Sequence, residues 1–164
     1  MMMVLLLASM ASAGSLGEGI LGRPWGSQMR PEDVRDCNPL SDVKVKQLSV
    51  TACPGTLGDA VFVSNFMYFD NALYGALIIA EDKRSCEELK ELSLIAWGAG
   101  VPANPLLTKT LDKWFWGYPQ RNPEYTASFL WDGIRCNLVV SNTETTRMVD
   151  RLMKAAKADV AAGL

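Results

Sequence analysis

The chain has no histidine among its 164 residues. Without an imidazole it cannot build a Ser-His-Asp or Cys-His catalytic arrangement. H-E-x-x-H metal sites and histidine-based pH switches are excluded for the same reason. The early glycines, at positions 14, 17, 19 and 22, fit neither nucleotide-binding fingerprint. Histidine-dependent catalysis and phosphate-loop chemistry are therefore ruled out.

Three further absences narrow the class of protein. No apolar run after the N-terminal segment reaches the roughly 18 residues that a membrane-spanning helix needs. Lysine and arginine (16 residues) are interspersed with aspartate and glutamate (18 residues), so no basic patch for nucleic acid emerges. No cysteine pair has C-x-x-C spacing, which argues against a zinc site. We predict no membrane span, no nucleic-acid partner, no metal and no cofactor.

The remaining route to catalysis is a pair of carboxylates of the glycosidase kind. Five aspartate and glutamate residues lie near expected strand ends or in a turn: Asp59, Asp70, Glu81, Asp82 and Asp132. Turn chemistry and solvation account for each of them. No catalytic residue is assigned.

The N-terminus has features of a cleavable secretory signal. Residues 1–13 read MMMVLLLASMASA, with an apolar stretch at Val4–Leu7 and an A-x-A cleavage pattern at Ala11–Ala13. No lysine or arginine precedes the apolar stretch, which departs from the usual pattern. The alternative is a buried N-terminal helix, but the glycine-rich residues 14–19 would end it at once. We predict a signal peptide at 1–13, a single domain at 14–164, and a periplasmic or secreted bacterial protein.

Four cysteines follow the signal: Cys37, Cys53, Cys86 and Cys136. An even number of cysteines in an exported chain predicts disulfide bonds, and four cysteines allow three connectivities. Free thiols are the alternative.

Hydrophobic periodicity predicts three helices, one single strand and two β-hairpins. In chain order these are a helix at 31–37, a strand at 43–50, a hairpin at 60–69 and 73–80, a helix at 85–97, a hairpin at 125–131 and 134–140, and a helix at 144–157. Ser85 and Glu88 form a capping box for the second helix. The last helix is expected to bury a stripe formed by Met148, Val149, Leu152, Met153 and Ala156. The Asp132-Gly133 pair predicts a tight hairpin turn. The predicted fold class is α+β, an antiparallel sheet built from two β-hairpins with helices packed on one face.

This arrangement favours one disulfide connectivity. Cys86 shares the inner face of its helix with Leu89, and Cys136 shares the inner face of its strand with Ile134, Leu138 and Val140. A Cys86–Cys136 bond would therefore join helix to sheet. Cys37–Cys53 would then tie the first helix to the loop after the first strand.

The pattern resembles small exported bacterial proteins of unassigned function. The resemblance is carried by Gly22-Arg-Pro-Trp-Gly-Ser27, by the Phe69–Tyr74 hairpin turn, by the helix that ends near Trp97-Gly98, and by the Trp131 hairpin. More distantly, the layout of helices and hairpins is similar to the β-lactamase-inhibitor-protein and outer-membrane-assembly lipoprotein folds. The chain lacks the lipid-anchor cysteine of the lipoprotein group. The resemblance implies no functional residue.

An aromatic cluster in a proline-rich segment is the best binding candidate. It comprises Trp114, Phe115, Trp116 and Tyr118. Large aromatic side chains on a loop suit sugar stacking or a protein interface, although in a small domain such residues more often cap one end of the core. Arg135 and Asn137 are expected on the outer face of the second hairpin, where they could line a binding surface or simply face water.

The sequence therefore predicts a non-enzymatic exported binding module, with another protein as its partner in the bacterial periplasm. Two alternatives stay open. The first is a small carboxylate-dependent hydrolase acting on cell-envelope glycans, which needs two carboxylates within about 10 Å in one cleft. The second is a carrier of an apolar ligand, which needs an apolar cavity of about 300 Å³ or more.

Overall fold

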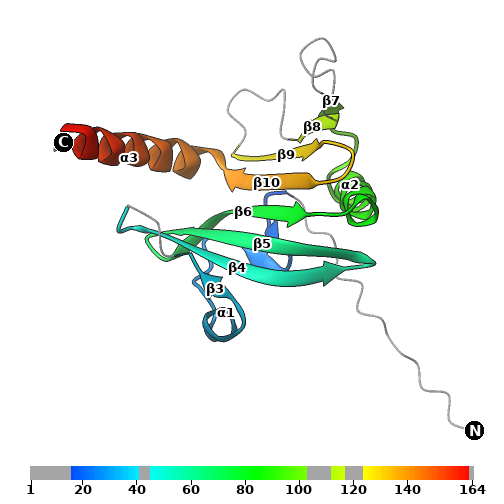
Figure 1. Cartoon of the computed structure of the whole chain (residues 1–164), viewed down its shortest axis with the longest axis horizontal. Helices are drawn as coiled ribbons and strands as arrows, with labels where there is room; N and C mark the ends of the chain where they lie inside the picture. The colour runs from blue at the N-terminus through cyan, green and yellow to red at the C-terminus, as the bar shows by residue number, and fades with distance from the viewer. Residues whose placement is uncertain (1–15, 41–44, 103–111, 117–123, 163–164) are drawn as a thin grey trace, which may run out of the picture.

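A large antiparallel sheet dominates the fold. The computed structural model describes residues 16–40, 45–102, 112–116 and 124–162. In this part of the chain, eight strands form one sheet, and two short strands form a separate hairpin (Figure 1). Three helices complete a sheet-rich α+β fold. The predicted signal peptide at 1–13 and Tyr118 lie outside the described residues.

The helices are α1 (Pro31–Asp36), α2 (Lys83–Trp97) and α3 (Thr143–Ala162). The separate hairpin consists of β1 (Gly19–Ile20) and β2 (Arg23–Pro24). The strands of the main sheet are β3 (Asn38–Pro39), β4 (Leu48–Leu57), β5 (Ala60–Phe69), β6 (Ala72–Ala80), β7 (Val101–Pro102), β8 (Asp112–Trp116), β9 (Tyr125–Trp131) and β10 (Cys136–Asn142).

The sheet consists of two similar halves. Its strand order is β3-β4-β5-β6-β10-β9-β8-β7, and every neighbouring pair is antiparallel. Each half is a meander whose last strand lies in the centre of the sheet and leads into a helix. The two predicted hairpins thus form the middle of the sheet, and β6 and β10 join the halves.

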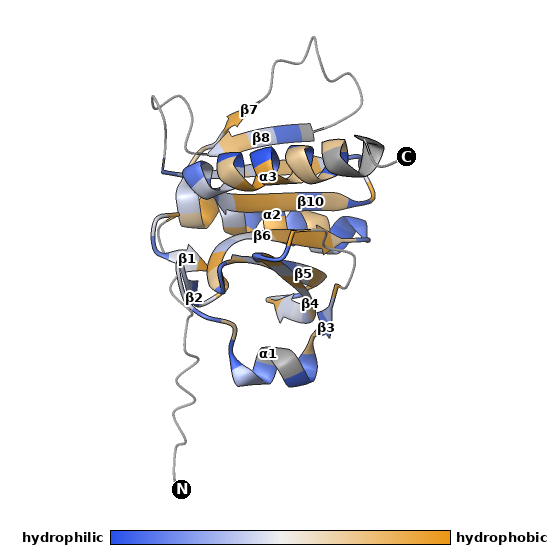
Figure 2. Cartoon of the chain, turned by 90° about the vertical axis from the view of Figure 1, so that its left-hand side faces the viewer, coloured by the Kyte–Doolittle hydropathy of each residue, from blue (hydrophilic) through white to orange (hydrophobic). Residues whose placement is uncertain are grey.

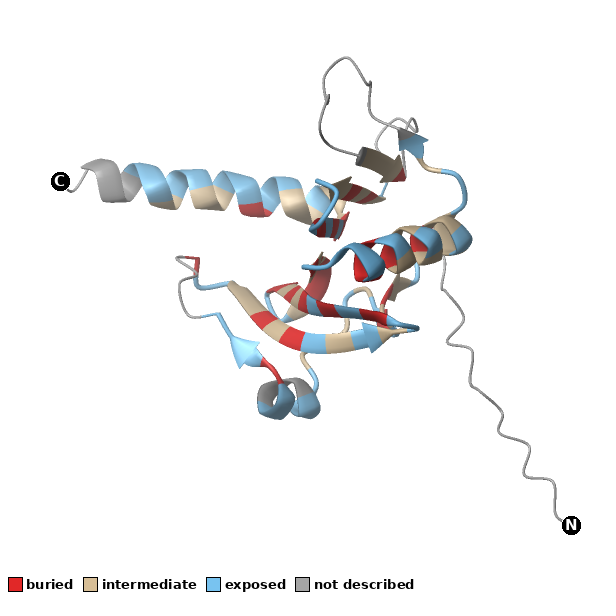
Figure 3. Cartoon of the chain, turned by 45° about the vertical axis from the view of Figure 1, so that its right-hand side comes forward, coloured by how far each residue is buried: buried red, intermediate tan, exposed pale blue. Residues whose placement is uncertain are grey.

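The β5–β6 hairpin matches its prediction closely. Asp70 and Asn71 occupy the turn with positive φ angles of 49° and 65°, a conformation that Asp and Asn tolerate better than other non-glycine residues. Along β5, buried side chains alternate with exposed or half-buried ones, as Figure 3 shows. This alternation divides the sheet into two faces, which we call the inner and the outer face.

The inner face holds the hydrophobic core. Its side chains come from the central strands: Phe62, Ser64 and Phe66 of β5, Ala76 and Ile78 of β6, Leu138 and Val140 of β10, Ala127 and Phe129 of β9, and Trp114 and Trp116 of β8. Figure 2 shows the hydrophobic character of β6 and β10. Phe129 and Val140 are fully buried.

The second hairpin turn is longer than predicted. The strands end at Trp131 and resume at Cys136, so four residues connect them instead of two. The Asp132 carboxylate accepts hydrogen bonds from the backbone N–H groups of Ile134 (2.9 Å) and Arg135 (2.7 Å). These bonds lower the pKa of Asp132. Ile134, expected on the inner face, is instead 65% exposed because it lies in this turn.

The first long strand is shifted along the chain. The sequence predicts a strand at 43–50, whereas β4 spans Leu48–Leu57 and residues 41–44 lie outside the described part. Pro54 and Gly55 have low strand propensity, which hides the second half of β4. Proline is tolerated where its nitrogen faces away from a partner strand, and β3 pairs with β4 only at Thr51 and Ala52.

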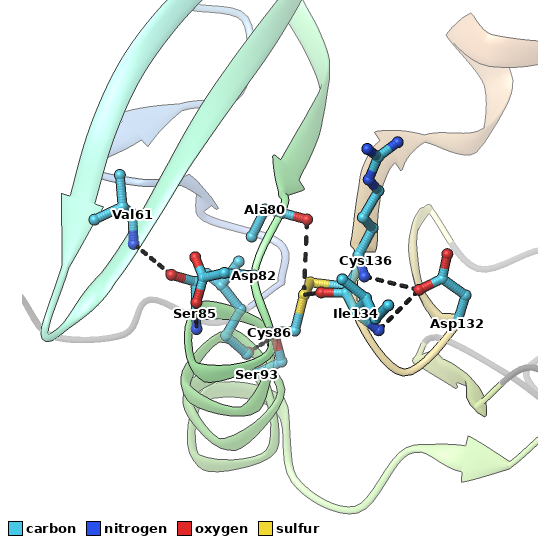
Figure 4. The surroundings of a disulfide bond; sticks show 11 residues. Val61, Ala80, Asp82, Ser85, Cys86, Ser93, Asp132, Ile134 and Cys136 are labelled. Atoms are coloured by element: carbon cyan, nitrogen blue, oxygen red, sulfur yellow. Dashed lines mark hydrogen bonds between the residues drawn. A yellow bond between two sulfur atoms is a disulfide. The ribbon is translucent and has the colours of Figure 1, made fainter.

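Helix α2 begins earlier than the predicted capping box. Its N-cap is Asp82, whose carboxylate accepts a hydrogen bond from the backbone N–H of Ser85 at 2.8 Å. Hydrogen bonding to Ser85 lowers the pKa of Asp82. The Ser85 hydroxyl accepts from the backbone N–H of Val61 at 3.0 Å (Figure 4). Ser85 therefore links the helix to β5 instead of capping it.

Both predicted disulfides are confirmed. Cys37 is bonded to Cys53 with 4.4 Å between their Cα atoms, and Cys86 to Cys136 with 5.7 Å. The second bond fastens the first turn of α2 to β10 (Figure 4). Cys53 lies within β4, so the first bond ties the end of α1 to a strand and not to a loop.

Helix α3 is longer and more exposed than predicted. It leaves the end of β10 and extends away from the sheet (Figures 1 and 3). Of its predicted buried stripe, Val149 is 7% exposed but Met148 is 41% exposed. Leu152, Met153 and Ala156 are half-buried. In the described residues, no helix is both long and apolar enough to cross a membrane.

Candidate binding surfaces

The aromatic segment at 114–116 belongs to strand β8, which the sequence pattern does not predict. A strand turns successive side chains to opposite faces of a sheet. Trp114 and Trp116 pair with Phe129 and Ala127 of β9 on the inner face, whereas Phe115 points to the outer face. The strand therefore separates the predicted aromatic cluster into two inner residues and one outer residue.

Trp116 is a core residue. It is 4% exposed, and its indole N–H donates to the carbonyl oxygen of Gly98 at 2.9 Å. Its ring meets that of Trp97 edge to face, with 5.5 Å between the centroids. The side chain thus fixes the C-terminal end of α2 against the sheet.

Trp114 is half-buried. It lies on β8, and Trp131 lies on the neighbouring strand β9. The ammonium group of Lys90 on α2 lies 4.8 Å from the centre of the Trp114 ring and 5.8 Å from that of Trp131. A cation over an aromatic ring is attracted by the ring's negative face. Lys90 therefore connects α2 to both strands.

The outer face of the sheet exposes apolar side chains. The registers place on it Val61, Val63 and Asn65 of β5, Leu77 and Ile79 of β6, Asn137 and Val139 of β10, Ser128 and Leu130 of β9, and Lys113 and Phe115 of β8. The ammonium group of Lys113 lies 5.0 Å from the centre of the Phe115 ring. A continuous cross-strand row runs from Val63 through Ile79 and Asn137 to Leu130. Each strand from β5 to β8 in the sheet thus contributes at least one apolar side chain to this face, with polar side chains between them.

The exposures on the outer face are high for apolar residues. Val61 is 61% exposed, Val63 43% and Val139 37%. Of the predicted binding residues, Phe115 and Asn137 belong to this face. Arg135 is exposed but lies in the turn before β10, beyond the paired strands.

A cleft of about 610 Å³ lies on the other side of the sheet, among α2, the β1–β2 hairpin and the inner face. Phe62, Phe66 and Ile78 belong to its floor, and Leu89, Leu92 and Trp97 to its helical wall. No sequence pattern indicates this cleft, because the β1–β2 hairpin that closes it contains only four paired residues.

Polar groups lie inside this apolar cleft. The guanidinium of Arg23 lies 3.7 Å from the centre of the Phe66 ring and donates to the Tyr68 hydroxyl at 3.2 Å. Arg23 is 7% exposed. Ser64 also lines this cleft and is 2% exposed, and its hydroxyl has no hydrogen-bond partner among the described residues.

A second, smaller cleft of about 340 Å³ lies at the opposite ends of the strands. Trp25 and Tyr125 stack there, with 5.1 Å between ring centroids and 14° between their planes. Burial raises the pKa of Tyr125. Burial and, to a smaller extent, the charge of Asp150 raise the pKa of Tyr74 in this cleft to about 12.

The raised pKa of Tyr74 makes stability sensitive to alkaline pH. The folded-state pKa of about 12 exceeds the ordinary value of 10.0. The stabilisation is therefore complete below pH 10 and is lost as the pH rises toward 12, because the unfolded tyrosine ionises first.

We expect the free energy of unfolding to fall as the pH rises from 10 to 12. Urea unfolding as a function of pH measures it. Tyr74→Phe should remove part of the slope, and an unchanged slope would contradict the assignment.

Carboxylates are scarce in the two described clefts. Between their described linings they hold one carboxylate, that of Glu18. A glycosidase mechanism needs two, so neither cleft supplies the pair that this alternative requires. Among the residues that the structure describes, no group of three His, Cys, Asp or Glu side chains lies close enough together to hold a metal ion.

Comparison of the chain with models of protein families, with curated proteins and with solved structures found no match. The resemblance to inhibitor and lipoprotein folds therefore stays a prediction.

Proposed function

We propose that the chain is a non-enzymatic binding module that acts outside the cytoplasm and binds another protein through the outer face. One observation carries this proposal, which is the exposure of Val61, Val63 and Val139 on one side of the central strands. An antiparallel sheet with one face in water normally places polar side chains there. Contiguous exposed apolar side chains mark interaction sites.

The shape of this surface favours a macromolecular partner. Neither of the two clefts is lined by a residue of the outer face, and the valines of that face lie open to solvent. Asn65 and Asn137 supply polar groups beside the valines. Protein–protein interfaces combine apolar contacts with hydrogen-bonding groups, and this face offers both.

The proposal also uses the finer fold prediction, that the helices pack on the inner face and leave the outer face open. Helix α2 supports it, because Cys86 and Leu89 belong to the core cluster on the inner face. Location outside the cytoplasm is supported by the two disulfides, which persist in oxidising compartments.

Placing charges on this surface tests the proposal. We expect the double substitution Val63→Asp and Val139→Asp to abolish partner binding, because a partner would have to bury two unpaired carboxylates. Both side chains are exposed, so the free energy of unfolding should change by less than about 1 kcal/mol. The measurement is crosslinking in the native envelope, followed by titration of the purified partner against each variant.

Ile134→Asp provides the matched control. Ile134 is apolar and 65% exposed but lies in the β9–β10 turn, off the outer face. This variant should bind the partner as the wild type does. If the double variant also retains wild-type affinity for every crosslinked protein, the outer face is not the interface.

A further inference from the structure

We infer that the cleft beneath α2 is a second binding site, for a small molecule with an apolar body and a carboxylate group. Its volume of about 610 Å³ falls in the range of pockets that bind small molecules, about 300–1,000 Å³. It lies on the face opposite the outer face, so this inference does not rest on the proposed function.

The walls of the cleft match an apolar body. Aromatic and aliphatic side chains from three elements line it: Phe62, Phe66 and Ile78 from the sheet, Leu89, Leu92 and Trp97 from α2, and Ile20 from β1. Transfer of apolar surface from water into such a cleft is favourable by about 25 cal/mol per Å².

The Ser64 hydroxyl marks the place of a polar group. A buried hydroxyl without a hydrogen bond is uncommon because its desolvation is not compensated. Ser64 is 2% exposed, and its hydroxyl has no partner among the described residues. It lies on the inner face between Phe62 and Phe66 on β5. A ligand atom that accepts its proton would satisfy it.

The positive charge of Arg23 favours a carboxylate over a neutral head group. The Arg23 guanidinium lies over the ring of Phe66, which is two residues along β5 from Ser64. Arg30 also lines the cleft and is paired with Glu32 at 3.2 Å, while Glu18 is the one described carboxylate in the lining. Hydrogen bonds from ionised donors to carboxylates are stronger than neutral ones. The described lining thus carries two guanidinium groups and one carboxylate, an excess of positive charge that suits an anionic head group.

Titration calorimetry with dodecanoate, below its critical micelle concentration, tests the site. We expect the disulfide-bonded chain to bind one dodecanoate, and to bind dodecanol and dodecylammonium at least about tenfold more weakly. Absence of saturable dodecanoate binding would overturn the inference. Equal binding of dodecanol would overturn the carboxylate assignment.

Two variants with matched controls locate the ligand. Ser64→Ala should weaken dodecanoate binding at least about fivefold. Thr51→Val removes a similarly buried, similarly unpartnered hydroxyl that does not line the cleft, and should leave binding unchanged. Leu92→Trp should block the cleft, whereas Glu91→Trp, on the exposed side of α2, should not. Wild-type affinity in both Ser64→Ala and Leu92→Trp would overturn the site.

Two further measurements distinguish this site from the outer face and from a dimer interface. The outer-face variant Val63→Asp with Val139→Asp should bind dodecanoate with unchanged affinity, so that failure at one surface does not imply failure at the other. Sedimentation of the wild type and Leu92→Trp reports the oligomeric state. A wild-type dimer that Leu92→Trp dissociates would assign the cleft to a second copy of the chain and overturn the inference.

Discussion

Replacing Cys86 and Cys136 together by alanine is expected to lower the free energy of unfolding by about 4 kcal/mol in the chain-entropy account of disulfide stabilisation. The bond closes a loop across a sequence separation of 50 residues and joins α2 to the centre of the sheet. Domains are commonly stable by only about 5–15 kcal/mol. Loss of this disulfide would therefore remove a large share of the total free energy of unfolding.

Urea unfolding of the purified variant measures this effect, and the other disulfide supplies the comparison. Cys37 and Cys53 are 16 residues apart, so their replacement by alanine should cost about 3 kcal/mol in the same account. A Cys86/Cys136 variant within about 1 kcal/mol of the wild type would show that packing alone holds α2 in place.

The second large effect is expected from Trp116→Ala, about 3–5 kcal/mol of lost stability. The substitution removes a ring that is 4% exposed, takes the indole donor from the Gly98 carbonyl, and removes the edge-to-face contact with Trp97. Three parts of the fold depend on this side chain, because it connects β8, the end of α2 and the core.

Phe115→Ala is the matched control one residue away. Phe115 points to the outer face and is half-buried, so its loss should cost less stability than the loss of Trp116 but weaken binding of the proposed protein partner. Chemical unfolding and partner titration of both variants separate the two roles. If Phe115→Ala destabilises the fold as much as Trp116→Ala does, the division of the strand into core and surface residues is wrong.

The central part of the fold follows from local signals. The Asp70-Asn71 turn and the alternation on either side of it define β5 and β6, and Cys136, Leu138 and Val140 show the inner face of β10 by their spacing. Because the inner faces of α2 and β10 could be recognised, both disulfides could be predicted. Short-range periodicity carries this information without knowledge of tertiary contacts.

The edges of the sheet and the cleft could not be predicted in this way. Strand β8 lies in a proline-rich segment, which does not look like a strand. Residues 117–123 separate β8 from its partner β9 along the chain, so no tight-turn signal indicates their pairing. Strand β4 contains Pro54, which local propensity disfavours but an unpaired strand side permits. The cleft depends on where the β1–β2 hairpin packs, which is a tertiary property. The unpartnered Ser64 hydroxyl has no signature in sequence at all.

The two outermost strands, β3 and β7, are each two residues long and each contain a proline, Pro39 and Pro102. Proline has no backbone N–H to donate. Very short edge strands present few backbone hydrogen-bonding groups to which an added strand could pair. Recruitment of a partner by β-augmentation is disfavoured at both ends of the described sheet. The proposed recognition of a protein would then depend on side chains, so single substitutions should change the choice of partner while the backbone stays as it is.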